Sequence, residues 1–348
     1  MDIMDKKIFF LLIMSIVAIL AVGSVSASED LTIDDVQVDD ISVNDVSTED
    51  VSNNLEEIET RTYDIDNTMN SSTINNKIST ASSGSHVLNF APGNYSNIAL
   101  ILQNNVVLNG NGAVLFGDGS NNIFTVTNCS NFTISGFVIN VNSNQKAAIY
   151  GSDVKNMAII NNNIIGGKDG INIFKTYENV TITGNTITNV IRDAISLVNH
   201  KNFTESQWSS WAASVVSGNI ISGGEYGMFF GGNFKGEINN NQISGSICGM
   251  EFAGKKAANN GRLSADLYGN TITGVTTGIN MFHPKIHYLN LTANTINVID
   301  SSSNYAIQTN DNFDWQGSIY VYYNNFTGLI KDTFIDAVGS NYGNNTGF

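Results

Sequence analysis

A short phrase recurs along most of the chain, and its spacing limits the folds that the sequence can adopt. It reads NNNII at 161, TGNTI at 183, SGNII at 217, NNNQI at 239, YGNTI at 268, TANTI at 292 and YNNF at 323. The aligned phrases give one column of asparagines: Asn163, Asn185, Asn219, Asn241, Asn270, Asn294 and Asn324. Two positions later they give an apolar column: Ile165, Ile187, Ile221, Ile243, Ile272, Ile296 and Phe326. A repeat of roughly 22 residues with occasional insertions predicts a solenoid.

Two further patterns complete each repeat. One opens with Ala or Gly and then alternates apolar with other residues, as in GINIF at 170 and GMEF at 249. The other is a short apolar stretch before each turn, as in NVTI at 179. Alternation of period two is typical of strands with one face in a core. Three short strands per coil, stacked about 4.8 Å apart, predict an all-β parallel β-helix of about ten coils from roughly Val87 onward. The stacked asparagines then form a ladder of amides.

The residue before each column asparagine predicts a tight turn. These residues are Asn162, Gly184, Gly218, Asn240 and Gly269. Glycine and asparagine adopt positive φ at little cost, so we expect a left-handed residue there. Ala293 and Tyr323 stand at this position in the last two repeats. We therefore expect those two coils to turn differently.

Composition supports strands and turns over helices. The 348 residues include 51 Asn and 32 Gly but only 2 Pro, and 14% are charged. Such a chain is poor in helix formers and rich in turn formers, which disfavours helical bundles and doubly wound α/β folds. The net charge of −15 belongs mainly to the stretch from Glu29 to Asp66, which has 14 acids and one base, Arg61. No basic surface remains to neutralise phosphates, so nucleic-acid binding is excluded as a function.

The N-terminal segment reads as a targeting signal. Lys6 and Lys7 precede an apolar run over 8–22 and small residues up to Ala27, which predicts a signal peptide over 1–27 and export. Residues 28–66 alternate acids with single apolar residues and predict an acidic disordered leader. The β-helix domain then spans 67–348, with a short amphipathic capping helix over 71–82, and we expect no membrane span after cleavage.

The cysteines and histidines carry no metal motif. Cys129 and Cys248 are about four or five coils apart in the repeat, too far for a disulfide, so we expect two unpaired and largely buried thiols. The four histidines are scattered, and CxxC and HExxH patterns are absent. The sequence therefore predicts no metal site and no cofactor.

The opening coils resemble a known family. VLNFAPGNYSN at 87, VVLNGNGAVLFG at 106 and the repeated NxI turns resemble right-handed parallel β-helix proteins of the pectate-lyase-like superfamily. With its leader and its many asparagines, the chain is most similar to secreted adhesin-like proteins of methanogenic archaea. The resemblance implies a right-handed, single-stranded β-helix that is secreted or at the cell surface. It leaves the activity open, since this fold serves lyases, hydrolases, epimerases and non-catalytic binders.

Carboxylates at equivalent positions of adjacent coils are the catalytic candidates. Asp169 and Asp193 stand before the alternating strand in two successive repeats, with Cα atoms expected about 5 Å apart, and Arg192 adjoins them. They predict either a retaining hydrolase pair or a cation site with Arg192 as base, and calcium enters only in this lyase alternative. The alternative is a surface ladder of charges without catalytic role. Glu251, which points outward in one column with Phe229 and Asn280, is a further candidate.

Aromatic residues gather in the insertions that follow the alternating strand. The candidates for glycan binding are Trp208, Trp211, Phe234, Phe282, His283, Phe313 and Trp315. Loops that leave equivalent positions of stacked coils emerge on one edge, so these rings form a strip for sugar rings or fold back and fill their own loops. The sequence leaves both arrangements open.

Three functions fit these patterns. The first is a secreted or cell-surface, adhesin-like β-helix that binds glycans or cell-surface polymers without catalysis. The second is a polysaccharide lyase or glycoside hydrolase that acts on an acidic polysaccharide, and the third is a structural component of the cell wall. Among nine Asn-X-Ser/Thr sequons, Asn70 and Asn202 are the predicted glycosylation sites because their segments look exposed.

Overall fold

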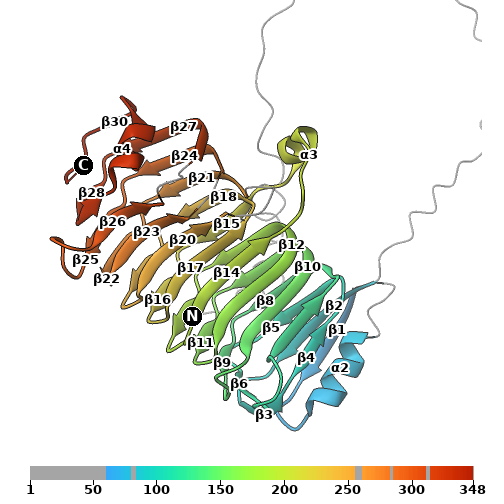
Figure 1. The fold of residues 1–348 in the computed structure, drawn as a ribbon. Helices are drawn as coiled ribbons and strands as arrows, with labels where there is room; N and C mark the ends of the chain where they lie inside the picture. The colour runs from blue at the N-terminus through green and yellow to red at the C-terminus, as the bar shows by residue number, and fades with distance from the viewer. Residues whose placement is uncertain (1–59, 80–83, 255–260, 283–284, 311–313, 348) are drawn as a thin grey trace, which may run out of the picture. The chain divides into compact units, whose positions relative to one another are not determined.

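The computed structural model describes residues 60–79, 84–254, 261–282, 285–310 and 314–347. Their strands stack into a parallel β-solenoid with three strand-bearing faces, here called face A, face B and face C (Figure 1). The predicted signal peptide and most of the predicted acidic leader lie outside the described residues.

Each face is a column of parallel strands. Face A contains β4 (Leu100–Leu102), β7 (Phe124–Thr127), the first parts of β10 (Ala147–Ile160) and β12 (Asp169–Thr183), β14 (Asp193–Asn199), β17 (Tyr226–Gly232), β20 (Cys248–Ala253), β23 (Thr277–Phe282), β26 (Tyr305–Thr309) and β29 (Leu329–Ile330). Face B contains β1 (Thr60–Ile65), β2 (Ser85–Phe90), β5 (Val106–Asn109), β8 (Ser130–Ser135), the second parts of β10 and β12, β15 (Ser214–Ser217), β18 (Phe234–Asn239), β21 (Arg262–Tyr268), β24 (Lys285–Thr292), β27 (Asp314–Tyr322) and β30 (Tyr342–Gly343). Face C contains β3 (Asn94–Ile98), β6 (Val114–Gly117), β9 (Val138–Asn140), β11 (Asn163–Ile165), β13 (Thr186–Thr188), β16 (Ile220–Ser222), β19 (Gln242–Ser244), β22 (Thr271–Val275), β25 (Thr295–Val298) and β28 (Asn325–Thr327). Faces A and B join into one sheet because β10 and β12 continue around the corner between them.

The stacking confirms the predicted right-handed parallel β-helix, with about 11 turns rather than about ten. Equivalent residues pair in strict parallel register, as in Ile164 with Ile187 and Ile187 with Ile221. Their side chains point inward and are at most 1% exposed. Burying these apolar columns is the main source of stability for the coil stack.

The asparagine ladder exists, but the predicted register was off by one residue in its first repeat. Asn162, and not Asn163, lies in the column, because Ile164 rather than Ile165 pairs with Ile187. In the run of three asparagines that begins at 161, the sequence alone does not show which one occupies the ladder position. The pairing of β11 with β13 decides this. The ladder continues beyond Asn324 to Asn345.

The turn before each ladder asparagine is left-handed in every described repeat that carries the phrase. In the first repeat the left-handed residue is Asn161, with φ 54°, and not the predicted Asn162, because of the same one-residue shift; Gly184 has φ 67°, as predicted. The prediction that Ala293 and Tyr323 turn differently was wrong, since their φ values are 54° and 60°. The hydrogen bonds of the ladder hold both residues in the shape of the other coils, although a Cβ atom disfavours it.

The solenoid begins earlier than the sequence predicted. Thr60–Ile65 forms β1 and pairs along its whole length with β2, so these residues belong to the first coil and not to the leader. The predicted capping helix is α2 (Ser71–Ser79), with Ile74 and Ile78 fully buried against the core; Ala81, which the prediction placed on the same helix, lies outside the described residues. Two shorter helices follow later, α3 (Glu205–Ser210) and α4 (Asp332–Val338) (Figure 1).

Two other predictions concern the cysteines and membrane-spanning segments. Cys129 and Cys248 are unpaired and buried, as predicted. None of the helices among the described residues is long and apolar enough to cross a membrane.

Candidate functional site

The outer surface of face A brings the predicted carboxylates together. Asp169 begins β12, and Asp193 begins β14 in the next coil, with Arg192 directly before it. The same outward column continues with Tyr226, which pairs with Asp193, and with Cys248. The repeat register therefore placed these residues correctly in adjacent coils.

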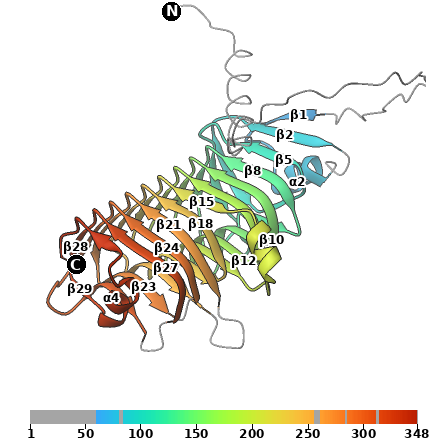
Figure 2. The same cartoon turned by 90° about the horizontal axis from the view of Figure 1, so that it is seen from above.

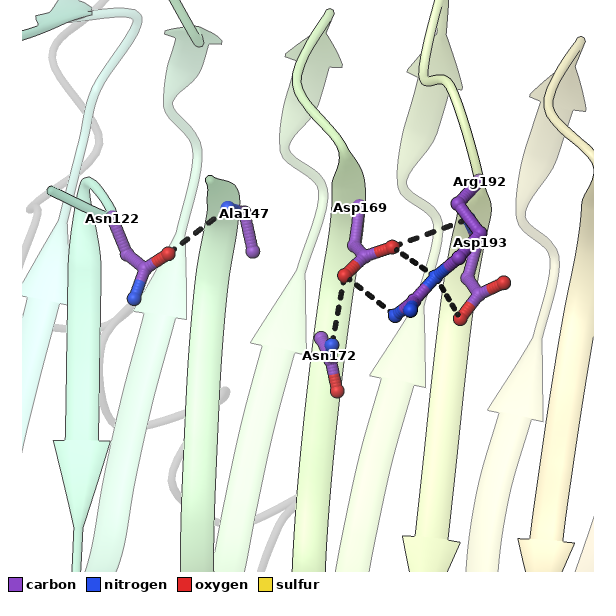
Figure 3. Close-up of polar contacts among 6 residues, drawn as sticks. All are labelled: Asn122, Ala147, Asp169, Asn172, Arg192 and Asp193. Atoms are coloured by element: carbon purple, nitrogen blue, oxygen red, sulfur yellow. Dashed lines mark hydrogen bonds and ion pairs between the residues drawn. The ribbon is translucent and has the colours of Figure 1, made fainter. Parts of the chain in front are cut away.

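Arg192 bridges the two carboxylates (Figure 3). Its Nε and Nη2 donate to Oδ1 and Oδ2 of Asp169 at 3.0 and 2.9 Å, a two-pronged contact, and Nε also lies 3.2 Å from Oδ2 of Asp193. Asn172 donates to Asp169 Oδ2 at 2.8 Å. The carboxylate side chains are only 5% and 6% exposed, whereas that of Arg192 is 38% exposed. Such a bidentate pair is strong and geometrically specific.

Asp169 also has a backbone role that recurs in the preceding coils. Its Oδ1 accepts a hydrogen bond from the backbone N–H of Asp193 at 3.4 Å. Asn122, which stands three coils before Asp193 in the same column, accepts from the backbone N–H of Ala147 at 2.9 Å in the same way (Figure 3). Asp169 thus ties one coil to the next through a buried hydrogen bond, a role that the sequence did not predict.

Asp193 is the carboxylate whose pKa best suits proton transfer near neutral pH. Burial raises the pKa of Asp193 to about 6, and the charge of Asp169 adds to this, while Arg192 and a hydrogen bond from Ser196 act in the opposite direction. A carboxyl that titrates near neutral pH can both donate and accept a proton there. Arg192 does not suit the role of a base, because its Nε and Nη2 are engaged by the two carboxylates.

Aromatic rings lie next to these acids. The ring of Tyr226 meets that of Phe229 edge-on, with centroids 5.6 Å apart, and both residues are half-buried on the outer side of β17. Phe229 pairs with Glu251 in the next coil, and Asn280 donates to Glu251 at 3.0 Å. This confirms the outward column in which the sequence placed Glu251, Phe229 and Asn280.

Burial and the charges around these rings raise the pKa values of two further groups. Burial raises the pKa of Glu251, with the charge of Glu225 adding to the effect. Burial, followed by the charges of Glu251 and Glu225, raises the pKa of Tyr226 to about 12. Asp193, Tyr226, Phe229 and Glu251 are called the face A patch below. Lys168 and Lys146 stand one and two coils before Arg192 at the same position of the repeat.

The aromatic insertions do not form an exposed strip among the described residues. Trp208 and Trp211 are 7% and 5% exposed and pack on each other and on Phe203. Trp211 donates from Nε1 to the backbone oxygen of Tyr177 at 3.2 Å, and Phe234 is 1% exposed in the core. These three rings fill the interior and the insertion, so the prediction that they bind glycans is wrong for lack of exposed ring surface.

The remaining aromatic candidates divide into exposed and undescribed residues. Phe282 ends β23 and is 46% exposed. His283, Phe313 and the side chain of Trp315 lie outside what the structure describes. Their part in glycan binding stays a prediction.

Two other predicted kinds of site can be placed. The described residues contain no group of three or more His, Cys, Asp or Glu side chains that suits a metal ion, so no calcium site can be assigned to them.

Asn70 is exposed and caps α2 by accepting from the backbone N–H of Thr73 at 3.0 Å, which leaves its amide nitrogen pointing away from that contact. Asn202 is exposed in the α3 insertion. Glycosylation of both stays a prediction.

Comparison with solved structures shows the same fold in two proteins. The first is described as pectate lyase Pel9A, with a TM-score of 0.54 and 13% sequence identity over 83% of this chain and 80% of that chain. The second is the mannuronan C-5 epimerase AlgE4 A-module of Azotobacter vinelandii, with a TM-score of 0.52 and 15% identity over 76% of this chain and 86% of that chain. No protein-family model matches the sequence, and no curated protein matches it significantly. At these identities the likeness establishes the fold: the chain is a parallel β-helix like those of pectate lyase and mannuronan epimerase.

Proposed function

We propose that the protein binds a polysaccharide at the face A patch and acts as a secreted or cell-surface, adhesin-like protein without catalytic activity. One observation carries the proposal: two half-buried rings, Tyr226 and Phe229, stand between carboxylates on the outside of a rigid sheet. Sugar rings present apolar faces and polar rims, and rings flanked by hydrogen-bonding groups match both. The two structural neighbours are named for polysaccharides, pectate and mannuronan, which supports a carbohydrate partner.

The arrangement of Arg192 supports binding over cleavage. The guanidinium occupies the space between Asp169 and Asp193, with contacts of 2.9–3.2 Å to both. A substrate that uses both carboxylates as a hydrolase pair must first displace it. Asp169 and Arg192 therefore serve mainly to hold adjacent coils in place beside the patch.

Polysaccharide binding in native gels tests the proposal. The polymers are polygalacturonate and alginate, and the variant is Tyr226→Ala combined with Phe229→Ala. We expect the double variant to lose about ten-fold in affinity for the polymer that the wild-type chain binds, as for truncation of aromatic anchors at other interfaces. Tyr342→Ala is the control, since this tyrosine is 51% exposed and lies in the last coil. Unchanged binding by the double variant rules out the face A patch as the site.

Cleavage of an acidic polysaccharide is a second candidate, and the acidity of Asp193 favours it. With a pKa of about 6, Asp193 alone suits proton transfer. A lyase releases unsaturated uronates and a hydrolase releases reducing sugars. Product that is formed by the wild type and lost in Asp193→Asn, with or without calcium, establishes the activity. A complete lack of product from polygalacturonate and alginate leaves non-catalytic binding.

A further inference from the structure

The outer surface of face B carries a second group of aromatic residues. Tyr268 pairs with Thr292 in the next coil, and Thr292 pairs with Tyr322 in the coil after that. Tyr320 pairs with Asn290 in the same two coils. Tyr288 lies on the same outer side of β24. Four tyrosines from three successive coils therefore share one surface, which we call the tyrosine platform: Tyr268, Tyr288, Tyr320 and Tyr322. Its strands β21, β24 and β27 lie side by side in Figure 2.

The rings are fixed and accessible. Tyr268 is 52% exposed, and the other three are half-buried. The rings of Tyr288 and Tyr320 lie 6.2 Å apart between centroids. The intervening strand residues Leu289 and Val321 are fully buried in the core, so the backbone under the rings is held by the coil stack. Rigid rings on strands lose little conformational entropy when a ligand binds.

Hydrogen-bonding groups lie among these rings. Tyr288 donates from Oη to Asp266 Oδ1 at 2.9 Å, and Asn290 donates to the same oxygen at 3.1 Å. Glu237 is the partner of Asp266 in the preceding coil. Burial and the adjacent Asp266 raise the pKa of Tyr288 to about 12, so its hydroxyl remains a donor at neutral pH. The second oxygen of Asp266 and the carboxylate of Glu237 offer acceptors to hydroxyl groups.

The charge of this surface selects against anions. Asp266 and Glu237 are acidic, and the basic residues of the same strands stand at the other end, beside the α3 insertion. There Lys235 donates from Nζ to the backbone oxygens of Trp208 and Trp211, and Arg262 pairs with Glu205 at 2.6 Å. These cations hold the insertion onto face B. A polyanion on the platform would meet two carboxylates and gain no counter-charge from these strands.

We propose that the tyrosine platform binds a neutral polysaccharide, whose sugar rings stack on Tyr268, Tyr320 and Tyr322 and whose hydroxyl groups donate to Asp266 and Glu237. The site lies on another face than the face A patch and uses none of its residues. The inference therefore stands whether or not face A binds a polymer. It gives the protein a second carbohydrate surface.

Affinity electrophoresis of the full chain tests the proposal. The gels contain hydroxyethyl cellulose, neutral xylan or polygalacturonate, and the protein comes from a host that adds no N-glycans. We expect retardation by at least one neutral polymer and about ten-fold weaker binding in Tyr268→Ala combined with Tyr320→Ala. Tyr342→Ala and the face A double variant Tyr226→Ala with Phe229→Ala are the controls, and both should keep this binding.

The outcomes separate the two sites. Loss of neutral-polymer binding in the face A variant alone overturns the platform proposal, and so does unchanged binding in the Tyr268 and Tyr320 variant. A wild-type chain that binds none of the neutral polymers, or that binds polygalacturonate through the platform, overturns it as well. Because either tyrosine variant can disturb the fold, circular dichroism and the melting temperature are compared with the wild type. The milder change Tyr288→Phe keeps the ring and removes one hydrogen bond, so we expect a smaller, two- to three-fold loss.

Discussion

Each buried ladder asparagine satisfies hydrogen bonds that no other side chain can satisfy together. Asn219, for example, donates from its backbone N–H and from Nδ2 to Asn241 Oδ1, at 3.0 and 2.9 Å. Its second Nδ2 hydrogen goes to the backbone oxygen of Ile182, and its own Oδ1 accepts two bonds from Asn185. Aspartate lacks the donors, and glutamine is longer by one methylene group. The ladder therefore explains why asparagine recurs at this position.

Asn219→Ala should destabilise the protein severely. The change leaves two donors of Asn185 without their acceptor inside the core, and it removes the side-chain donors to Asn241 Oδ1 and to the backbone oxygen of Ile182. Each such loss costs about 1–3 kcal/mol, so we expect a total of roughly 3–5 kcal/mol, measured by urea unfolding.

A second asparagine ladder on the outer surface, formed by Asn105, Asn131, Asn156 and Asn179, provides the matched control. Asn156 donates to Asn131 at 2.8 Å in the surface ladder and has φ 52°, which glycine adopts without strain. Asn156→Gly should cost less than about 1 kcal/mol, because water replaces its hydrogen bonds. Equal losses in the two variants would show that burial of the ladder contributes nothing.

At the scale of elements, insertions and ion pairs fasten one coil to another. The α3 insertion closes over face B through Trp208, Lys235 and Arg262 rather than extending into solvent. On face A, Arg192 links the starts of β12 and β14. Both contacts join segments from different coils. The sequence made the α3 insertion and Arg192 candidates for contact with a ligand or substrate, but in the structure they hold neighbouring coils together.

The Asp193 carboxyl should make stability depend on pH. Its pKa is raised from 3.8 to about 6 in the folded chain, so the native state binds more protons than the unfolded state between these values. The contribution to stability is full below about pH 4 and is lost as the pH rises through about 6, by at most about 3 kcal/mol. Relative to wild type, Asp193→Asn should therefore become more stable as the pH rises from 4.5 to 7.5, measured by thermal unfolding.

A second variant checks the assignment of this effect. Arg192 lowers the pKa of Asp193, so Arg192→Gln should move the same transition to higher pH. If the stability difference between Asp193→Asn and wild type does not change with pH, the raised pKa is wrong.

For the whole molecule, the first coil and its cap define where the stack starts. Ile65 at the end of β1 is 1% exposed, and its backbone oxygen accepts from the buried hydroxyl of Tyr95 at 2.9 Å. β1 also covers the edge of β2. A solenoid end without such cover exposes apolar side chains and unpaired backbone groups.

Truncation tests this boundary. We expect a chain of residues 60–348 to melt at the temperature of the full chain, because β1, α2 and the core remain together. A chain of residues 67–348, the domain predicted from the sequence, loses β1 and should melt several degrees lower or aggregate. Identical melting of the two truncated chains would place the start of the stable domain after β1.

The repeat in the sequence was sufficient to predict the solenoid, its three strands per coil, its inward columns and the amide ladder. These features depend on residues within one repeat and on the same residues one repeat later, so periodicity reveals them. Only the tertiary structure decided which asparagine of the run at 161 joins the ladder, that Trp208 and Trp211 face inward, and that the side chains of Asp169 and Asp193 are buried under Arg192. It also gathered the tyrosines of face B, which are spread over three coils, onto one surface. The physical reason is that register, burial and acidity arise from neighbours in other coils, and insertions of varying length conceal which residues those neighbours are.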